Sequence, residues 1–254
     1  RVTSSSACPR RAPSFCSLEF GEIVRASGET LLSLVDRILE VSRRGERALA
    51  VTPLLLHECF EEAVDHVAPG AAAKGLDLAL SIDRAASRRV VGDPTRLREI
   101  ATNLLANAVK FTESGGVLAQ VRAQAIDGAL AVVLEVSDTG IGIAAEDQAR
   151  IFEAFEQVDA SLGRRYGGAG LGLAIAREAC VSMRGGLSVE SKLGKGSTFT
   201  ATVKLDLDGE PGDAALDVRL NGRDVLLVGL TGPTRTAIES QLRSWGGLPQ
   251  SVAN

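Results

Sequence analysis

The chain has 254 residues and carries 28 Lys and Arg against 32 Asp and Glu, which gives a net charge of −4. This balance supplies no basic surface, so we expect no nucleic-acid partner. No apolar run reaches the roughly 20 residues that a membrane-spanning helix needs, and the amino terminus lacks the pattern of a signal peptide. The cysteines lack CxxC spacing, which excludes a zinc site of that kind and fits reduced thiols in a cytoplasmic protein.

The amino-terminal part divides into two segments. Residues 1–16 are rich in Ser, Pro and Arg and have no periodicity, so we expect irregular structure. Apolar residues between 19 and 42 recur at a spacing near that of a helix face and predict one long amphipathic helix. Because such a helix usually covers its apolar face with a partner helix, we predict a homodimer through residues 19–42. Packing within the monomer is the alternative.

Helices and strands alternate through the rest of the chain. Asp93-Pro94 is a helix start signal, since Asp accepts hydrogen bonds from free amides and Pro fits the first helical position. The turn at Asp127-Gly128 predicts a hairpin. The expected helices span residues 54–67, 93–111, 145–156, 171–183 and 233–245, and the expected strands span residues 76–82, 89–91, 117–124, 130–137, 187–191 and 198–204. Residues 206–220 are typical of a linker, and "RDVLLVGL" after it is typical of a buried strand.

Three polar residues share one face of the helix 93–111. Asn103, Asn107 and Lys110 are separated by four and three residues, so they lie on the same side. Asparagine is a poor helix former, so helix propensity does not explain the two asparagines here. Amide oxygens are hard ligands that suit Mg²⁺, and a lysine offers a compact charge for phosphate. The face therefore predicts a magnesium and phosphate site.

Two glycine-rich stretches supply the other parts of such a site. Asp138-Thr139-Gly140-Ile141-Gly142 follows an apolar strand, but the loop at 158–170 leaves no second strand for a dinucleotide-binding unit. Gly194-Lys195-Gly196 lacks the Ser or Thr of a P-loop. Gly168, Gly170 and Gly172 precede a helix, where free amides bind anions; a flexible surface loop is the alternative. Asp138 can accept a hydrogen bond from the amine of adenine, which contributes about 1.5–3 kcal/mol.

Five blocks in order resemble the catalytic, ATP-binding domain of sensor histidine kinases, in the wider family of gyrase, Hsp90 and MutL. They are "DPTRLREIATNLLANAVKFT", "DTGIGI", "IFEAFEQVD", "RRYGGAGLGLAI" and "GGLSVESKLGKGSTF". The resemblance covers about residues 93–204 and places the catalytic domain at 51–205. It implies an α+β fold, a two-layer α/β sandwich of Bergerat type in which a mixed sheet packs on helices, preceded by the long amino-terminal helix.

The resemblance also implies ATP and Mg²⁺ as cofactors and a role for each site residue. Asn107 is implied as the magnesium ligand, and Asn103 and Lys110 as the catalytic residues on the phosphate side. Asp138 would read adenine, and Phe152 and Phe155 would pack the base of a lid. The other implied ATP-binding residues are Gly140 and Gly142 near the base, Gly168, Gly170, Leu171 and Gly172 in the lid hinge, Arg165 and Tyr166 in the lid, and Thr198 at the adenine end. A solvated loop charge is the alternative for Arg165.

The flanking segments resemble parts of the same kinases. Residues 17–50 resemble the second helix of the dimerisation and phosphoacceptor hairpin, whose first helix, with the acceptor histidine, we do not find in this chain. His57 and His66 come after the hairpin and are expected to be ordinary helix residues. Residues 221–254 resemble the start of a receiver domain, cut short. Gly229 and Leu230 stand where receivers have a pair of acidic residues, so this part is expected to be degenerate.

Together these features predict an ATP-dependent protein-histidine kinase of the hybrid type in a two-component phosphorelay. The γ-phosphate of Mg-ATP would pass to a histidine on the dimerisation hairpin, and a response-regulator receiver domain would be the partner. Relatives that hydrolyse ATP have a glutamate at the position of Asn103, and an amide cannot act as a general base, which fits transfer to a protein. The alternative is an ATP-binding regulatory module without phosphotransfer. The chain alone is expected not to autophosphorylate in cis, and it could be the cytoplasmic part of a membrane-bound sensor.

Overall fold

The computed structural model describes residues 49–126, 128–156, 170–208 and 220–252. The chain divides into two units, residues 1–47 and 48–254, and every element described below belongs to the second. The predicted helix at 19–42 and almost all of the hairpin segment at 17–50 lie outside the described residues, so the dimer stays a prediction. Among the described helices, none is both long and apolar enough to cross a membrane.

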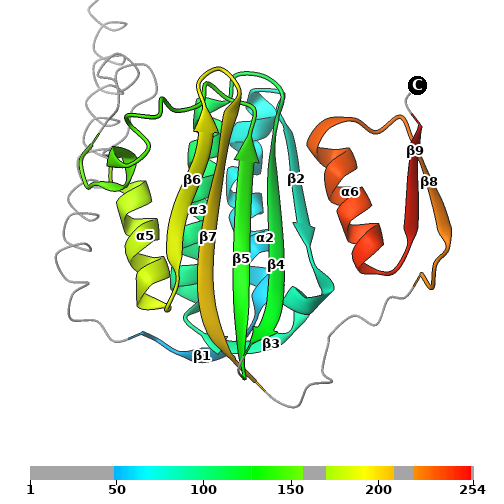
Figure 1. Cartoon of the computed structure of the whole chain (residues 1–254), viewed down its shortest axis with the longest axis horizontal. Helices are drawn as coiled ribbons and strands as arrows, with labels where there is room; N and C mark the ends of the chain where they lie inside the picture. The colour runs from blue at the N-terminus through cyan, green and yellow to red at the C-terminus, as the bar shows by residue number, and fades with distance from the viewer. Residues whose placement is uncertain (1–48, 127, 157–169, 209–219, 253–254) are drawn as a thin grey trace, which may run out of the picture. The chain divides into compact units, whose positions relative to one another are not determined.

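A seven-stranded mixed sheet forms one layer of the domain (Figure 1). Its strands run in the order β1-β3-β7-β5-β4-β2, with β6 also paired to β7. Within this sheet of the described residues, β2 and β4 pair in parallel and the other pairs are antiparallel. The strands are β1 (Thr52–Leu55), β2 (Asp77–Ile82), β3 (Arg89–Gly92), β4 (Gly116–Ile126), β5 (Ala129–Asp138), β6 (Gly186–Lys192) and β7 (Gly196–Leu207).

Helices α2 (Leu56–Ala73), α3 (Pro94–Phe111) and α5 (Gly172–Ser182) form the second layer. Alternate residues of β5 face them, since Val132, Leu134 and Val136 are buried while the residues between are half-exposed. The helices contribute apolar stripes at helical spacing to the same core. The buried residues of α3 are Leu97, Ile100, Ala101, Leu104, Leu105, Ala108 and Val109. The predicted two-layer α/β sandwich is confirmed.

The start of α3 follows its sequence signal. Asp93 is only 6% exposed, and its Oδ1 accepts hydrogen bonds from the amides of Thr95 at 3.0 Å and Arg96 at 3.1 Å. Its other oxygen accepts from the amide of Ala50 at 3.0 Å, which ties the segment before β1 to the helix. The cap thereby fixes where the helix bearing the polar face begins.

Three predicted boundaries were wrong. Residues 145–156 form turns and a short 3-10 helix, η2 (Arg150–Phe152), because half-buried side chains such as Ile151 pack on the core from a loop and mimic helical spacing. Helix α2 continues through Pro69 to Ala73. Pro69 is exposed, and at an exposed position water can bond the carbonyl that loses its helical partner. The predicted helix start at residue 54 was also wrong, since Leu54 and Leu55 belong to β1. A second 3-10 helix, η1 (Arg84–Ser87), precedes β3.

The carboxy-terminal part is a small βαβ unit. It consists of β8 (Asp224–Val228), α6 (Gly232–Ser244) and β9 (Leu248–Val252), with β8 and β9 parallel. The sequence predicted one strand and one helix and missed β9, because Pro249 cannot donate to a strand ladder and argued against a strand there. Residues 209–219, most of the predicted linker, lie outside the described residues.

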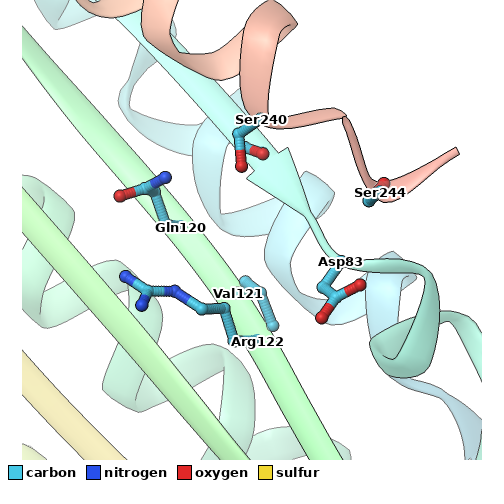
Figure 2. Close-up of a pocket in the computed structure, with 7 residues that line it drawn as sticks. Asp83, Gln120, Val121, Arg122, Ser240 and Ser244 are labelled. Carbon is cyan, nitrogen blue, oxygen red and sulfur yellow. The ribbon is translucent and has the colours of Figure 1, made fainter. Parts of the chain in front are cut away.

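Helix α6 packs against the edge strand β2. The amide of Thr234 donates to Asp77 at 3.1 Å, and the amide of Ile82 donates to the side chain of Gln241 at 3.1 Å. A small polar cleft of about 190 Å³ lies between the helix and the sheet, and Figure 2 shows its walls. Ser81, Asp83, Gln120, Val121, Arg122, Ser240 and Ser244 line it. None of them belongs to the predicted site.

Candidate functional site

The polar face of α3 lies at the border between core and solvent. Asn103, Asn107 and Lys110 are all half-buried, as their common face predicts. The Nζ of Lys110 lies 4.7 Å from the ring centroid of Phe111. Burial lowers the pKa of the Lys110 ammonium below its ordinary value, which means that the charge is partly stripped of water. A partly desolvated cation of this kind interacts more strongly with an anion than one in bulk water does.

The end of α3 is joined directly to the first glycine stretch. The amide of Ile141 donates to the carbonyl of Phe111 at 3.3 Å. A Cβ on Gly140 would lie 2.5 Å from that same carbonyl oxygen, so only glycine allows the loop to come this close. The end of α3 and the loop after β5 are therefore in direct backbone contact and belong to the same candidate site.

Asp138 ends β5 and begins this loop. Its Oδ1 accepts a hydrogen bond from the amide of Gly140 at 2.8 Å, which fixes the carboxylate. Burial raises the pKa of Asp138 above its ordinary value, and the backbone N–H groups of Gly140 and Ser197 reverse only part of this rise. The carboxyl group is thus an oriented and partly desolvated hydrogen-bond acceptor.

The turn between β6 and β7 supports the loop from the other side. Gly142 has φ +69°, and a Cβ there would lie 2.2 Å from the carbonyl oxygen of Lys192. The amide of Gly194 donates to the carbonyl of Ile141 at 2.7 Å. Glycines 140 and 142 are both required by the close approach of neighbouring backbone, and their predicted role beside the base stays a prediction.

Thr198 lies on the face of the sheet opposite to Asp138. It pairs with Ser137, and the two hydroxyls are 2.9 Å apart. Ser197 pairs with Asp138, is buried, and has its hydroxyl 2.9 Å from that of Ser191. The structure therefore brings Ser197 to the side of Asp138 and does not bring Thr198 there.

Ser191 extends this network to the glycine loop, because its hydroxyl accepts from the amide of Ile143 at 2.8 Å. Sequence reasoning missed both serines. The period of two along β7 contained the signal for Ser197, since Phe199 and Ala201 of the same strand point to the core.

The start of α5 meets the polar face of α3. A Cβ on Gly172 would lie 3.0 Å from Oδ1 of Asn103, so the glycine backbone lies directly against that amide. Leu171 is buried and anchors the entry of the helix, and among the described residues no side chain caps this end. Gly170 has φ +68°, and its carbonyl accepts from the amide of Phe155 at 3.1 Å. The amides of this first turn have no partner within the helix, so they can bind an anion beside Asn103.

Three comparisons place this arrangement among known proteins. Residues 92–207 match the family described as Histidine kinase-, DNA gyrase B-, and HSP90-like ATPase. Residues 92–207 therefore form an ATPase domain of this family. The signal transduction histidine-protein kinase BarA of Escherichia coli K12 is 39% identical over 188 residues, which cover 73% of this chain and 20% of BarA.

Two further relatives agree with this. The sensor protein GacS of Pseudomonas syringae is 34% identical over 226 residues, which cover 88% of this chain and 25% of GacS. The crystal structure of full-length ShkA in complex with AMPPNP has a TM-score of 0.78 at 34% identity and covers 92% of this chain and 48% of that one. The chain thus spans about a fifth to a quarter of the curated relatives and about half of the ShkA structure.

The ATPase domain has few acidic metal ligands of its own. In the described ranges no group of three His, Cys, Asp or Glu side chains could hold a metal ion. Mg²⁺ commonly takes only one or two protein oxygens and completes its shell with water and substrate phosphates. Asn107, one turn from Asn103 and Lys110, fits that smaller demand. Arg165, Tyr166 and Gly168 of the predicted lid lie outside the described residues.

The two described cysteines are unrelated to the site. Cys59 on α2 and Cys180 on α5 are free, as expected, and both belong to the core. Burial raises the pKa of Cys59 to about 11 and that of Cys180 to about 12, so both are protonated at neutral pH. Such thiols are poor nucleophiles and poor metal ligands.

Proposed function

We propose that this chain is the ATP-binding part of an ATP-dependent protein-histidine kinase, which transfers the γ-phosphate of Mg-ATP to a histidine on a dimerisation hairpin. The observation that carries the proposal is the contact between Asn103 and the backbone of Gly172. It joins the polar face of α3 to the amides that begin α5, while the Phe111–Ile141 hydrogen bond joins the same helix to the loop of Asp138.

Each side chain has a task that follows from its chemistry. Asn107 offers an amide oxygen to Mg²⁺, and Lys110 offers a partly desolvated ammonium to a phosphate. The bound metal would neutralise charge on the phosphate oxygens during transfer. Asn103 orients the phosphates from α3 and cannot remove a proton from water, which favours transfer over hydrolysis.

Asp138 selects the base in this proposal. An ionised carboxylate accepts a hydrogen bond from the exocyclic amine of adenine, whereas guanine would present a carbonyl oxygen to it. The Asp138 carboxylate is fixed by the amide of Gly140, so it is oriented before the base arrives. Ser197 lies beside Asp138. We therefore assign the hydroxyl at the adenine end to Ser197 and no longer to Thr198.

The partners remain part of the proposal. The acceptor histidine is expected on a hairpin to which residues 17–50 contribute one helix, with a homodimer through residues 19–42. A receiver domain would take the phosphoryl group next. The alternative, an ATP-binding regulatory module, is favoured by one feature of the carboxy-terminal unit: Gly229 and Leu230 follow β8 where receivers have acidic metal ligands.

Binding is tested by titrating the whole chain with Mg-ATP in a calorimeter. We expect Asn107→Asp and Asp138→Asn each to weaken binding at least about tenfold. Asn107→Asp adds a negative charge beside the phosphates, and Asp138→Asn removes a charged acceptor whose hydrogen bond contributes about 1.5–3 kcal/mol. Asn221→Asp and Asp224→Asn make the same changes at exposed positions outside the site and should bind as the wild type does. Equal affinities for all four variants would exclude this site.

Transfer is tested with a separate hairpin domain that carries an intact acceptor histidine. After incubation with γ-labelled ATP, a kinase leaves label on that domain that is lost in acid and kept in base. The Asn107→Asp chain is the control and should leave none. Tight binding of Mg-ATP without any label would favour the regulatory module over the kinase.

A further inference from the structure

The last turn of α3 presents carbonyl groups that lack helical partners. The final four carbonyls of an α-helix take their partners from outside the helix, and in α3 these belong to residues 108–111. The carbonyl of Ala108 accepts from the amide and the hydroxyl of Thr112, at 3.1 and 2.7 Å. That of Phe111 accepts from the amide of Ile141 at 3.3 Å. The carbonyls of Val109 and Lys110 complete the last turn, and the carbonyl of Thr112 directly follows the helix.

One side chain satisfies all three remaining carbonyls. The Nζ of Lys74 donates to the carbonyl of Val109 at 2.6 Å, to that of Lys110 at 2.8 Å and to that of Thr112 at 3.1 Å. Lys74 follows the last residue of α2, so it lies 35 to 38 residues earlier in the chain than its acceptors. An ammonium group has three N–H donors, which matches the three acceptors.

The charge of Lys74 suits this position as well as its hydrogen bonds do. The carboxy-terminal end of a helix carries a partial negative charge, which a nearby cation stabilises. Hydrogen bonds from an ionised donor are also stronger than neutral ones. The side chain is exposed overall, so water weakens these terms, but the convergence of three bonds on one atom holds the geometry.

The end of α3 is where the two halves of the site meet. Lys110 belongs to this last turn, and the carbonyl of Phe111 holds the loop of Gly140 and Asp138 through Ile141. We propose that Lys74 is a positioning residue for the nucleotide site. By holding the last turn of α3, it sets the distance between the phosphate contact on the helix and the adenine contact on the loop. This inference rests on the proposed function.

The test compares Lys74→Met, which keeps the stem and removes the ammonium, with Lys74→Arg. Calorimetric titration of the whole chain with Mg-AMPPNP should show Lys74→Met binding about tenfold more weakly, the loss expected when a group that orients a ligand is removed. Lys74→Arg restores the charge and should recover most of that affinity. Lys204→Met removes an exposed lysine of β7 outside the site and should leave binding unchanged.

A second readout separates positioning from general stability. Hydrogen exchange of the Ile141 amide, followed by NMR, reports directly on its bond to Phe111. It should become faster in Lys74→Met and stay near the wild-type rate in Val67→Ala. The latter removes core methyl groups from the same helix α2 and serves as the destabilised control.

The outcomes are distinct. Weaker binding and faster Ile141 exchange in Lys74→Met, with recovery in Lys74→Arg, support the inference. If the wild-type chain binds Mg-AMPPNP and Lys74→Met binds it equally well, the inference is overturned and the proposed function stands. The inference is also overturned, and the proposed function stands, if Val67→Ala loses as much affinity as Lys74→Met when the two variants have equal free energies of unfolding. If the wild-type chain does not bind the nucleotide at all, the proposed function fails, and the positioning role fails with it.

Discussion

Helices α3 and α6 begin in the same way and are held in place very differently. Both have a proline in the first turn and an aspartate that accepts hydrogen bonds from the first amides. For α3 this is Asp93, the residue just before the helix. For α6 it is Asp77 on β2, 157 residues earlier than Thr234, while the adjacent Thr231 makes no capping bond among the described residues.

The two helices also differ in what they bury. Helix α3 buries seven side chains in the core and is bonded to other elements at both ends. In the described structure α6 fully buries only Ala237 and touches the sheet through a few polar bonds. Helix α3 is therefore part of the framework of the proposed nucleotide site, whereas α6 is attached to the edge of the sheet.

The largest expected contrast is in the core contacts. Leu104→Ala on α3 should lower the free energy of unfolding by about 2–5 kcal/mol, because Leu104 is fully buried and its loss leaves a cavity. Ile238→Ala on α6 should cost less than about 1.5 kcal/mol, since Ile238 is half-buried. Urea unfolding followed by circular dichroism measures both. Equal costs would contradict the view that α3 belongs to the core and α6 does not.

The next contrast concerns the cap of α3. Asp93→Ala should lower the free energy of unfolding by about 1–2 kcal/mol, because the amides of Thr95 and Arg96 lose their acceptor. Asp93→Asn keeps an oxygen at the cap and should cost less than Asp93→Ala in the same urea titration. If the two variants unfold together, the capping bonds do not stabilise this helix start.

The free energy of unfolding is expected to depend on pH through Asp138, at the end of β5. Burial raises the pKa of Asp138, so the folded state holds this proton more tightly than the unfolded chain does. Stability without nucleotide should therefore fall as the pH rises through the window between the ordinary carboxyl pKa and the raised one.

Binding should show the opposite trend, because adenine needs the ionised form. Affinity for adenosine should fall by up to about tenfold per pH unit below the raised pKa. Adenosine is the probe because it has no phosphate that titrates. The Asp138→Asn chain lacks the carboxyl group and should not show this step. A wild-type affinity that is independent of pH in that range would remove Asp138 from base recognition.

A smaller effect is expected at the start of α6. Asp77→Ala should cost about 0.5–1 kcal/mol, because the amide of Thr234 loses its acceptor in a partly exposed place. Amide exchange should become faster in the first turn of α6 and stay unchanged in α3. Faster exchange in both helices would show that α6 is coupled to the framework more tightly than its contacts indicate.

The smallest effect is expected on the exposed side of α6. Arg243 pairs with Glu239 at 3.1 Å, four residues earlier on the same helix. Arg243→Ala should change the free energy of unfolding by no more than about 0.5 kcal/mol, since exposed helix pairs of this kind contribute little. Thermal unfolding at low and high salt measures it. If Arg243→Ala is clearly less stable than the wild type at high salt, this side of α6 contacts something other than water.

Features that depend on neighbours along the chain could be predicted from the amino-acid sequence. Asp93-Pro94 marked the start of α3, the helical spacing put Asn103, Asn107 and Lys110 on one face, and Asp138 was correctly placed at the end of a strand. These signals are local because capping, helical periodicity and strand alternation involve residues only a few positions apart.

Features that depend on distant partners are set by the fold. Ser197 replaces Thr198 beside Asp138 because the register of β5 and β7 sets which side chains share a face. The loop around Ile151 packs on the core without being helical, and β9 forms despite Pro249 because β8 offers it a ladder. Lys74 and Asp77 reach the ends of helices far along the chain. Such partners are chosen by the fold, since no local pattern encodes a hydrogen bond across 35 residues or more.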